Sequence, residues 1–218
     1  MDNSFTRFDR NKHIYTNNEQ IDELLKDILR FFNGTPVQPL PPTEKFVGAG
    51  CYALYYTGRG NPEYNILYEL NRTEYRIPIY VGKAVPSGWR QSRISESSDG
   101  AELYNRLRDH YKSISNSCNL DISNFACRFT IFEGKSVGMI ASVEAKLIET
   151  YMPLWNSCID GFGNHDPGSG RYAQAVSEWD SLHQGRPWVK KLTGDIPNRD
   201  LIIIKIEDYL EELKRRFK

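Results

Sequence analysis

The sequence lacks several features that would point directly to a class of partner. It carries no excess charge, because 28 lysines and arginines balance 28 aspartates and glutamates. A nucleic-acid partner is still compatible with this balance, since binding depends on local clusters of charge. No apolar run approaches the roughly 18 residues of a membrane helix, and the N-terminal "MDNSFTRFDRNK" is too polar for a signal peptide. We therefore expect a cytoplasmic protein with no membrane partner.

Cysteines are few, and none of the four forms a C-x-x-C pair. A zinc site that uses Cys118, Cys127 and His110 is conceivable, but its spacing fits no usual zinc pattern. Reduced, mostly buried thiols are the favoured interpretation. A Walker loop and a G-x-S-x-G elbow are also absent. The stretch "GAGCYA" (48–53) resembles a dinucleotide-binding loop, but such a loop must follow a strand and open a helix. Here a proline-rich segment precedes it and β-forming residues follow it, so we expect no organic cofactor.

Tyrosine and glycine stand out in two apolar segments. "GCYALYYTG" (50–58) and "PIYVGKAV" (78–85) predict buried strands at about 49–57 and 77–83, each with a tyrosine near glycine. A third strand is predicted at 125–132, and the proline-rich residues 36–42 form an extended connector. Helices are predicted at 19–33, 63–71, 101–116, 137–151, 172–183 and 206–217. This order indicates an α+β protein with a small three-stranded antiparallel sheet covered by helices.

One carboxylate lies where the helical pattern predicts core. Glu144 falls in the middle of the apolar stripe of the helix at 137–151, next to Val143 and Leu147. A lone buried carboxylate has a large desolvation cost, so it must be paired, protonated or bound to a metal. A buried ion pair with an arginine or lysine and a functional role are both open on this evidence.

A basic pair occupies one face of the preceding helix. Arg106 and His110 are four residues apart, so they project from the same face beside Leu107. An arginine and a histidine beside a core stripe suit phosphate binding or acid–base chemistry. An exposed basic face is the alternative, and for these two residues alone it is favoured. Asn156 is a further polar residue among large apolar neighbours.

Together these elements resemble the GIY-YIG nuclease superfamily. Its first motif appears as Gly50-Cys51-Tyr52 and its second as Tyr80-Val81-Gly82. The family's helix arginine, metal-binding glutamate and later asparagine match Arg106, Glu144 and Asn156. Lys83 matches the lysine that usually follows the second motif in the repair-nuclease branch. Either tripeptide alone is a weak signal, whereas five elements in this order are specific. The resemblance covers about residues 46–157.

Two departures point to one branch of the superfamily. Tyr52 and Tyr80 are 28 residues apart, so residues 58–76 form an insertion, and His110 stands where the repair branch carries a tyrosine. With an N-terminal helix and a C-terminal extension, the chain is most similar to the GIY-YIG type II restriction endonucleases. We expect an N-terminal arm and connector (1–45), a catalytic core (46–157) and an extension for DNA contact or dimerisation (158–218), all in one compact unit.

The resemblance implies Mg²⁺-dependent hydrolysis of phosphodiester bonds. It implies one divalent ion on Glu144, with Mn²⁺ as a substitute. Tyr52 would orient and deprotonate the attacking water, and His110 would accept the proton. Lys83 would give electrostatic help, and Arg106 would clamp the phosphate. Tyr80 would donate a hydrogen bond in the cluster, and Asn156 would orient the metal or a neighbouring side chain.

The implied substrate is double-stranded DNA, cut at a short GC-rich palindrome by a homodimer. DNA contacts are expected from the insertion, from residues 89–93 and from the loop at 160–171. The candidate DNA-binding residues are Arg90, Gln91, Arg93, Asn164, His165 and Arg171. A repair or homing-type nuclease and a non-catalytic DNA-binding module are the alternatives.

Overall fold

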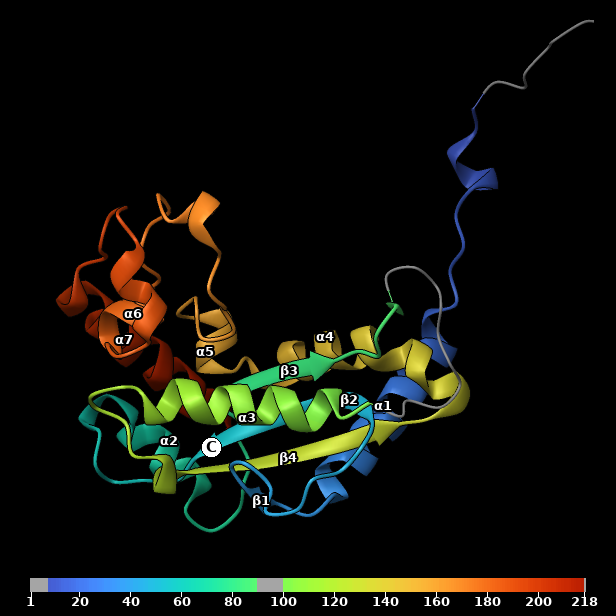
Figure 1. The fold of residues 1–218 in the computed structure, drawn as a ribbon. Helices are drawn as coiled ribbons and strands as arrows, with labels where there is room; N and C mark the ends of the chain where they lie inside the picture. The colour runs from blue at the N-terminus through green and yellow to red at the C-terminus, as the bar shows by residue number, and fades with distance from the viewer. Residues whose placement is uncertain (1–7, 90–99, 218) are drawn as a thin grey trace, which may run out of the picture.

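The two tyrosine segments form neighbouring antiparallel strands in a computed structural model that describes residues 8–89 and 100–217. Strand β2 (Ala49–Tyr56) pairs with β3 (Tyr80–Ala84) on one side and with β4 (Phe125–Phe132) on the other. Helices pack around this sheet, as Figure 1 shows, so the predicted α+β class is confirmed. No helix among the described residues combines the length and apolar character needed to cross a membrane.

The sheet has one strand more than predicted. Within the described residues its order is β1-β4-β2-β3, and β1 is the two-residue strand Gln38–Pro39 from the proline-rich segment. That segment was predicted to be a connector only. Proline is tolerated at a sheet edge because no further strand needs its missing N–H. Pairing of β1 with β4 covers one edge of the sheet, so β3 forms the opposite edge.

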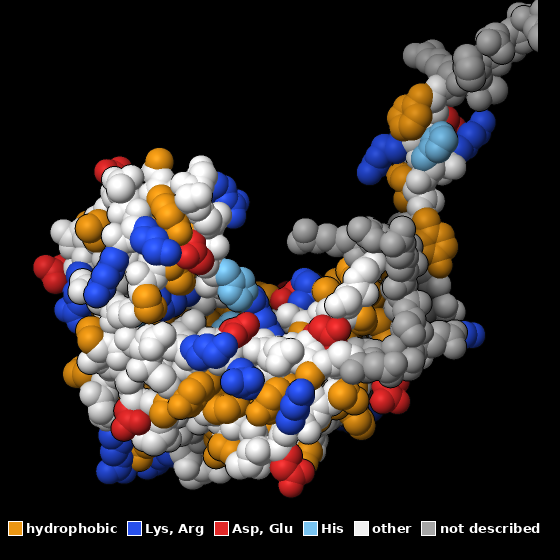
Figure 2. All heavy atoms as spheres, viewed as in Figure 1, with side chains coloured by type: hydrophobic (Ala, Val, Ile, Leu, Met, Phe, Trp, Pro, Cys, Tyr) orange, Lys and Arg blue, Asp and Glu red, His pale blue; other side chains and the backbone are white. Residues whose placement is uncertain are grey.

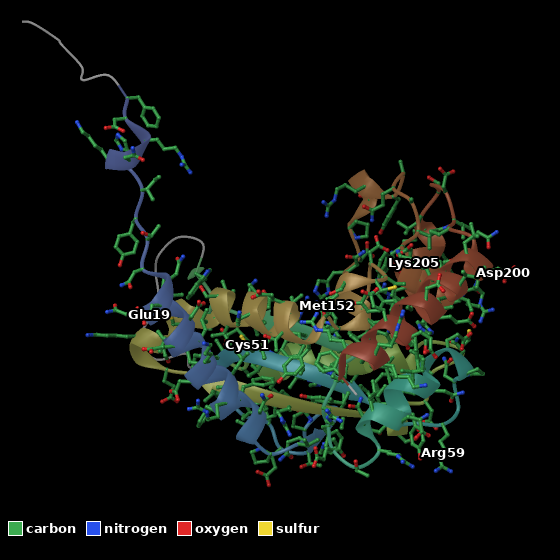
Figure 3. The ribbon with its side chains drawn as sticks, turned by 180° about the vertical axis from the view of Figure 1, so that it is seen from behind. Glu19, Cys51, Arg59, Met152, Asp200 and Lys205 are labelled. Carbon is green, nitrogen blue, oxygen red and sulfur yellow. The ribbon has the colours of Figure 1, made fainter. Side chains whose placement is uncertain are left out.

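Both faces of β2 are buried, which explains its continuous apolar sequence. Tyr52, Leu54 and Tyr56 face one hydrophobic core, and Cys51 and Ala53 face another. Helix α3 (Glu102–Ser115) covers the first face. Helices α4 (Ile140–Tyr151) and α1 (Asn18–Gly34) cover the second face, as the view from behind shows (Figure 3).

The insertion between the two motifs is an ordered loop with a short helix, α2 (Asn65–Asn71). The amide of Asn71 closes it by donating to the carbonyls of Tyr56 and Ile77, at 3.1 and 2.8 Å. The same side chain accepts from the backbone N–H of Arg76 and Ile77. Asn71 therefore joins the end of β2 to the residues just before β3. This connection fixes the offset between Tyr52 and Tyr80.

The C-terminal segment differs most from the sequence prediction. It follows α5 (Leu154–Ser157) and contains α6 (Glu178–Leu182) and α7 (Arg199–Phe217). The helix predicted at 172–183 begins only at residue 178, because Ser177 caps it by accepting from the N–H of Asp180. The last helix begins seven residues earlier than the predicted start at 206. Asn198 caps it by accepting from the N–H of Asp200.

Candidate active site

Tyr52 and Tyr80 lie on the same face of the sheet. Tyr52 is paired with Gly82, and Leu54 with Tyr80, so the tyrosines are diagonal neighbours rather than direct partners. Their ring centroids are 6.2 Å apart. A Cβ at position 82 would collide with the Tyr52 hydroxyl. The glycine of the second motif therefore leaves space beside the hydroxyl of the first.

Helix α3 brings a histidine to the Tyr52 hydroxyl. Its oxygen lies 2.5 Å from Nε2 of His110, and both side chains are buried. One turn earlier, Arg106 is half-buried; its guanidinium contacts His165 and donates to the carbonyl of Gly163 at 3.3 Å. The two residues therefore do not form an exposed basic face. They line the tyrosine pair, as the functional interpretation requires.

Lys83 and Glu144 form an ion pair beside the same edge strand. In β3, Lys83 points away from the Tyr52 face and meets Glu144 from α4; the glutamate side chain is 18% exposed. The ion-pair alternative for Glu144 is thus present, and its partner is itself a candidate site residue. Because β3 is an edge strand, side chains from both faces of the sheet converge on it.

Asn156 binds the backbone of β3 rather than another side chain. Its Oδ1 accepts from the N–H of Val81 at 2.8 Å, and its Nδ2 donates to the carbonyl of Val81 at 2.9 Å. Both backbone groups lie on the open edge of the sheet. The amide acts as a substitute for a neighbouring strand, so it fixes the strand that carries Tyr80 and Lys83.

Burial keeps the tyrosine–histidine pair neutral. Burial raises the pKa of Tyr52 well above its usual value, and Tyr80 raises it further, while the charge of Arg106 opposes this shift. Burial lowers the pKa of His110 well below 6.5, and Arg106, His165 and Arg186 add to this effect. A neutral imidazole offers a free nitrogen lone pair, so it can accept the phenol proton.

Charged residues lie around the neutral Tyr52–His110 pair. Burial lowers the pKa of Arg106, but its interactions with Tyr52 and Tyr80 outweigh burial and the net shift is upward. For Tyr80, burial is the main cause of a raised pKa; Arg106 opposes the shift and Glu144 adds to it. The cluster thus brings together a neutral imidazole, a fixed cation and a partly exposed carboxylate.

Two of the predicted DNA contacts lie next to this cluster. His165 touches Arg106, and Asn164 is exposed in the same loop. Arg171 is exposed, and its Nε donates to the carbonyl of Pro167 at 3.3 Å. Figure 2 shows a hollow beside the C-terminal segment, with basic, acidic and histidine side chains at its floor. Arg90, Gln91 and Arg93 lie outside the described residues.

The sequence analysis missed Phe162 and Gly163. The Phe162 ring stacks on His110, with centroids 4.6 Å apart and planes 18° apart. A Cβ on Gly163 would lie 2.8 Å from the Tyr80 hydroxyl. The glycines of "DGFGNH" were the available signal, because glycine often marks a close approach of the backbone to another group.

No metal-binding cluster of three or more His, Cys, Asp or Glu side chains occurs in residues 8–89 and 100–217. The conceivable zinc ligands are separate: His110 binds Tyr52, Cys118 is exposed, and Cys127 is buried and donates to the carbonyl of Pro39. Glu144 is therefore the metal-ligand candidate that the site offers, together with water and substrate oxygens.

Comparison with known families agrees with this geometry. The family model described as the Eco29kI GIY-YIG domain matches residues 44–210. This range contains the whole side-chain cluster described above, and it continues far into the C-terminal segment. Comparison with curated proteins gives no match to the chain. Because the family model covers well over half of the sequence, the chain belongs to the Eco29kI GIY-YIG family of restriction endonucleases.

Proposed function

We propose that this protein is a type II restriction endonuclease that hydrolyses phosphodiester bonds in double-stranded DNA with Mg²⁺, for which Mn²⁺ can substitute. The observation that carries the proposal is the 2.5 Å contact between the Tyr52 hydroxyl and His110, beside Arg106. A proton acceptor and a fixed cation in one cluster suit attack of water on a phosphate diester.

The metal requirement fits the residues present. Mg²⁺ retains several waters and binds one or two carboxylates plus phosphate oxygens. Glu144 supplies one carboxylate, partly exposed, at the edge of the sheet. Lys83 neutralises it in the free protein, so that no unpaired charge is left half-buried. When bound, the ion supplies positive charge that stabilises the leaving 3′-oxygen and the reacting phosphate.

Tyr52 and His110 together activate the attacking water. The water gives a proton to the Tyr52 oxygen while Tyr52 gives its own proton to Nε2 of His110. The water oxygen bonds to phosphorus, the bond from phosphorus to the 3′-oxygen breaks, and that oxygen takes a proton from solvent. This relay avoids a full phenolate, which burial and Tyr80 disfavour.

The remaining residues bind or position groups. Arg106 stays charged and clamps the scissile phosphate. Tyr80 donates a hydrogen bond in the same cluster, and Lys83 adds positive charge. Asn156 holds the edge strand that carries both of them. Its proposed role is therefore orientation of neighbouring side chains rather than of the metal.

A restriction enzyme must cut two antiparallel strands, so we propose a homodimer on a short, GC-rich palindrome. A two-fold axis gives each strand its own catalytic cluster in the correct orientation. Asn164 and His165 lie beside the proposed phosphate site and are candidate DNA contacts, as are Arg171, Arg90, Gln91 and Arg93. The cytoplasm is the proposed location.

Digestion of unmethylated phage DNA separates the function classes. With Mg²⁺ or Mn²⁺ we expect discrete fragments, and with chelator we expect none. A smear, or cutting confined to damaged or branched DNA, supports a repair-type nuclease. Binding without cutting at any divalent ion supports a non-catalytic module. Discrete but rare cuts at long asymmetric sites support a homing-type enzyme.

Mixed dimers test the symmetry. Wild type and Tyr52→Phe are combined and incubated with a plasmid that carries one site. Each mixed dimer holds one intact cluster, so it should nick one strand and produce open circles in proportion to its abundance. Direct linearisation by mixed dimers, or one monomer per site in sedimentation, would contradict the dimer.

A further inference from the structure

The backbone carbonyls of residues 161–164 all accept hydrogen bonds from two arginines, Arg186 and Arg106. Arg186 donates to three of these carbonyls, at 2.9, 3.2 and 3.0 Å, and its acceptors are Gly161, Phe162 and Asn164. The fourth carbonyl, that of Gly163, accepts from Arg106. The loop is therefore held on one side by Arg186 and touches the proposed phosphate clamp on the other.

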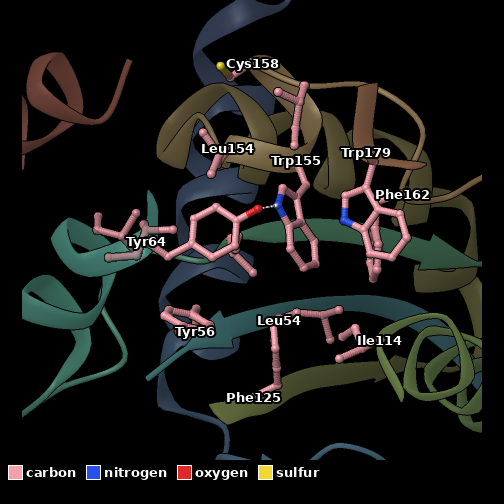
Figure 4. Close-up of a cluster of buried hydrophobic side chains, with 14 of the residues drawn as sticks. Leu54, Tyr56, Tyr64, Ile114, Phe125, Leu154, Trp155, Cys158, Phe162 and Trp179 are labelled. Atoms are coloured by element: carbon pink, nitrogen blue, oxygen red, sulfur yellow. Dashed lines mark hydrogen bonds between the residues drawn. The ribbon is translucent and has the colours of Figure 1, made fainter. Parts of the chain in front are cut away.

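Arg186 itself is fixed by a buried network. Its side chain is 3% exposed and that of Asp180 is 1% exposed. Nε and Nη2 donate to the two oxygens of Asp180 at 2.6 and 2.5 Å. Ser177 adds a hydrogen bond to the same carboxylate at 2.7 Å. The guanidinium also lies 4.6 Å from the ring centre of Trp179, which Figure 4 shows beside Phe162.

The loop packs closely between this network and the candidate site at two glycines. Gly161 has a φ of +100°, and a Cβ there would collide with Ser177. A Cβ on Gly163 would lie 2.8 Å from the Tyr80 hydroxyl. Small residues at both positions thus allow the backbone to pack directly against the Asp180 network and the catalytic cluster.

Phe162 links the position of the loop to that of His110, the proposed base. Its ring stacks on His110, with centroids 4.6 Å apart, and meets Tyr80 edge-on at 4.8 Å. Such aromatic contacts are sensitive to offset and angle. A shift of the loop would move the His110 ring relative to the Tyr52 hydroxyl, and it would move the carbonyl that accepts from Arg106.

We propose that Arg186 is a positioning residue for catalysis, which holds the loop of residues 161–165 so that His110 and Arg106 are aligned with Tyr52. This inference rests on the proposed nuclease function. It assigns part of the C-terminal segment, beyond residue 157, to the structure of the active site. Lysine cannot replace Arg186, because one ammonium group cannot match the planar fork that binds Asp180 and three carbonyls at once.

The test compares Arg186→Lys with a matched control, Arg199→Lys. Arg199 belongs to the same C-terminal segment and pairs with Glu63 at 3.2 Å, away from the loop carbonyls. Three readouts are used. The first is single-turnover cleavage of the site mapped from the phage digest, and the second is DNA affinity measured in chelator. The third is the set of ring signals of ¹⁵N-labelled histidines in the free protein. His13 in the N-terminal arm is the internal reference.

Arg186→Lys should lower the cleavage rate by roughly 10- to 100-fold, because small misplacements of catalytic groups have effects of that size. DNA affinity should change less than about threefold, since the phosphate-contacting side chains remain. The His110 signals should shift while those of His13 stay, and Arg199→Lys should match wild type in every readout. A wild-type cleavage rate, or a rate loss without any shift of the His110 signals, overturns the proposal.

Phe162→Leu provides a second test if Arg186→Lys does not fold. It leaves Arg186 and Asp180 intact and removes only the ring that stacks on His110. The same slow cleavage and shifted His110 signals are expected, and wild-type behaviour overturns the proposal. If the His110 signals shift as expected but the wild type cuts no DNA, positioning is supported and the nuclease function fails.

Discussion

Two buried tyrosine–histidine pairs lie in the described core, and their central contacts have the same length. The Tyr52 hydroxyl is 2.5 Å from Nε2 of His110, and the Tyr64 hydroxyl is 2.5 Å from Nε2 of His183. Both tyrosines are fully buried, and burial raises the pKa of each well above 10. The contact alone therefore does not distinguish a catalytic pair from a structural one.

The neighbours of the two pairs differ. Around Tyr64, protein groups complete the network: Trp155 donates to its hydroxyl at 3.1 Å (Figure 4), and Asn119 lies 2.8 Å from Nδ1 of His183. Around Tyr52, the positive charge of Arg106 opposes the raised pKa of the tyrosine. The pair also lies beside the edge strand β3, where Gly82 leaves space at the Tyr52 hydroxyl. We therefore assign chemistry to the Tyr52 pair and packing to the Tyr64 pair.

The largest expected effect comes from removing the charge of Glu144. Glu144→Gln should reduce cleavage below detection, because it removes the proposed metal ligand, and it should leave DNA binding measurable. Glu63→Gln is the matched control, since the charge of Glu63 acts on Tyr64 as that of Glu144 acts on Tyr52. Cleavage and DNA affinity are measured for both variants. Mg²⁺-dependent cleavage by Glu144→Gln would refute the metal assignment, as would an equal loss in Glu63→Gln.

Removing His110 and His183 in turn should distinguish a role in proton transfer from a role in packing. His110→Ala should lower the cleavage rate by roughly 10²- to 10⁴-fold, the usual contribution of a general base. Added imidazole should restore part of the rate by filling the cavity and accepting the proton. His183→Ala should lower the melting temperature instead, and imidazole should leave its cleavage rate unchanged. A His110→Ala rate that imidazole does not change would indicate that His110 positions groups without accepting a proton.

Acid should destabilise the protein through both pairs. The pKa of His183 is lowered to about 3 and that of His110 falls well below 6.5, in both cases mainly by burial. Below pH 6.5 the unfolded chain binds protons that the folded protein excludes, so stability falls as pH falls. Each histidine contributes about 1.4 kcal/mol per pH unit in this window. Unfolding by denaturant between pH 7 and 5 measures the slope, and each His→Gln variant should reduce it. An unchanged slope in both variants would contradict neutral burial.

The side-chain cluster around Tyr52 was largely predictable because local motifs carry its members. Tyr52, Tyr80, Arg106 and Glu144 each lie at a recognisable place in a strand or helix. The tyrosine strands and the α+β class follow from the same patterns. Helix α7 was predicted too short because its first turns contain three consecutive isoleucines, which favour strands over helices.

The missed parts depend on contacts between distant residues. Tyr64 and His183 are 119 residues apart, and no periodicity links them. Arg186 is linked to the candidate site by hydrogen bonds to loop carbonyls, which a sequence pattern does not reveal. Strand β1 exists because β4 offers a free edge, so its pairing overrides the local preference of a proline-rich segment.

The most direct measurement compares Tyr52→Phe with Tyr64→Phe, which remove the same atom from the two pairs. Single-turnover cleavage is measured at saturating enzyme, at a temperature where both variants are folded. Tyr52→Phe should cut at least about 100-fold more slowly than wild type, and Tyr64→Phe should stay within about threefold. Tyr64→Phe should be the less stable variant, because it leaves Nε1 of Trp155 and Nε2 of His183 without a hydrogen-bond partner, at about 1–3 kcal/mol for each group. Near-wild-type cleavage by Tyr52→Phe, or equal losses in both variants, would contradict the assignment of chemistry to the Tyr52–His110 pair.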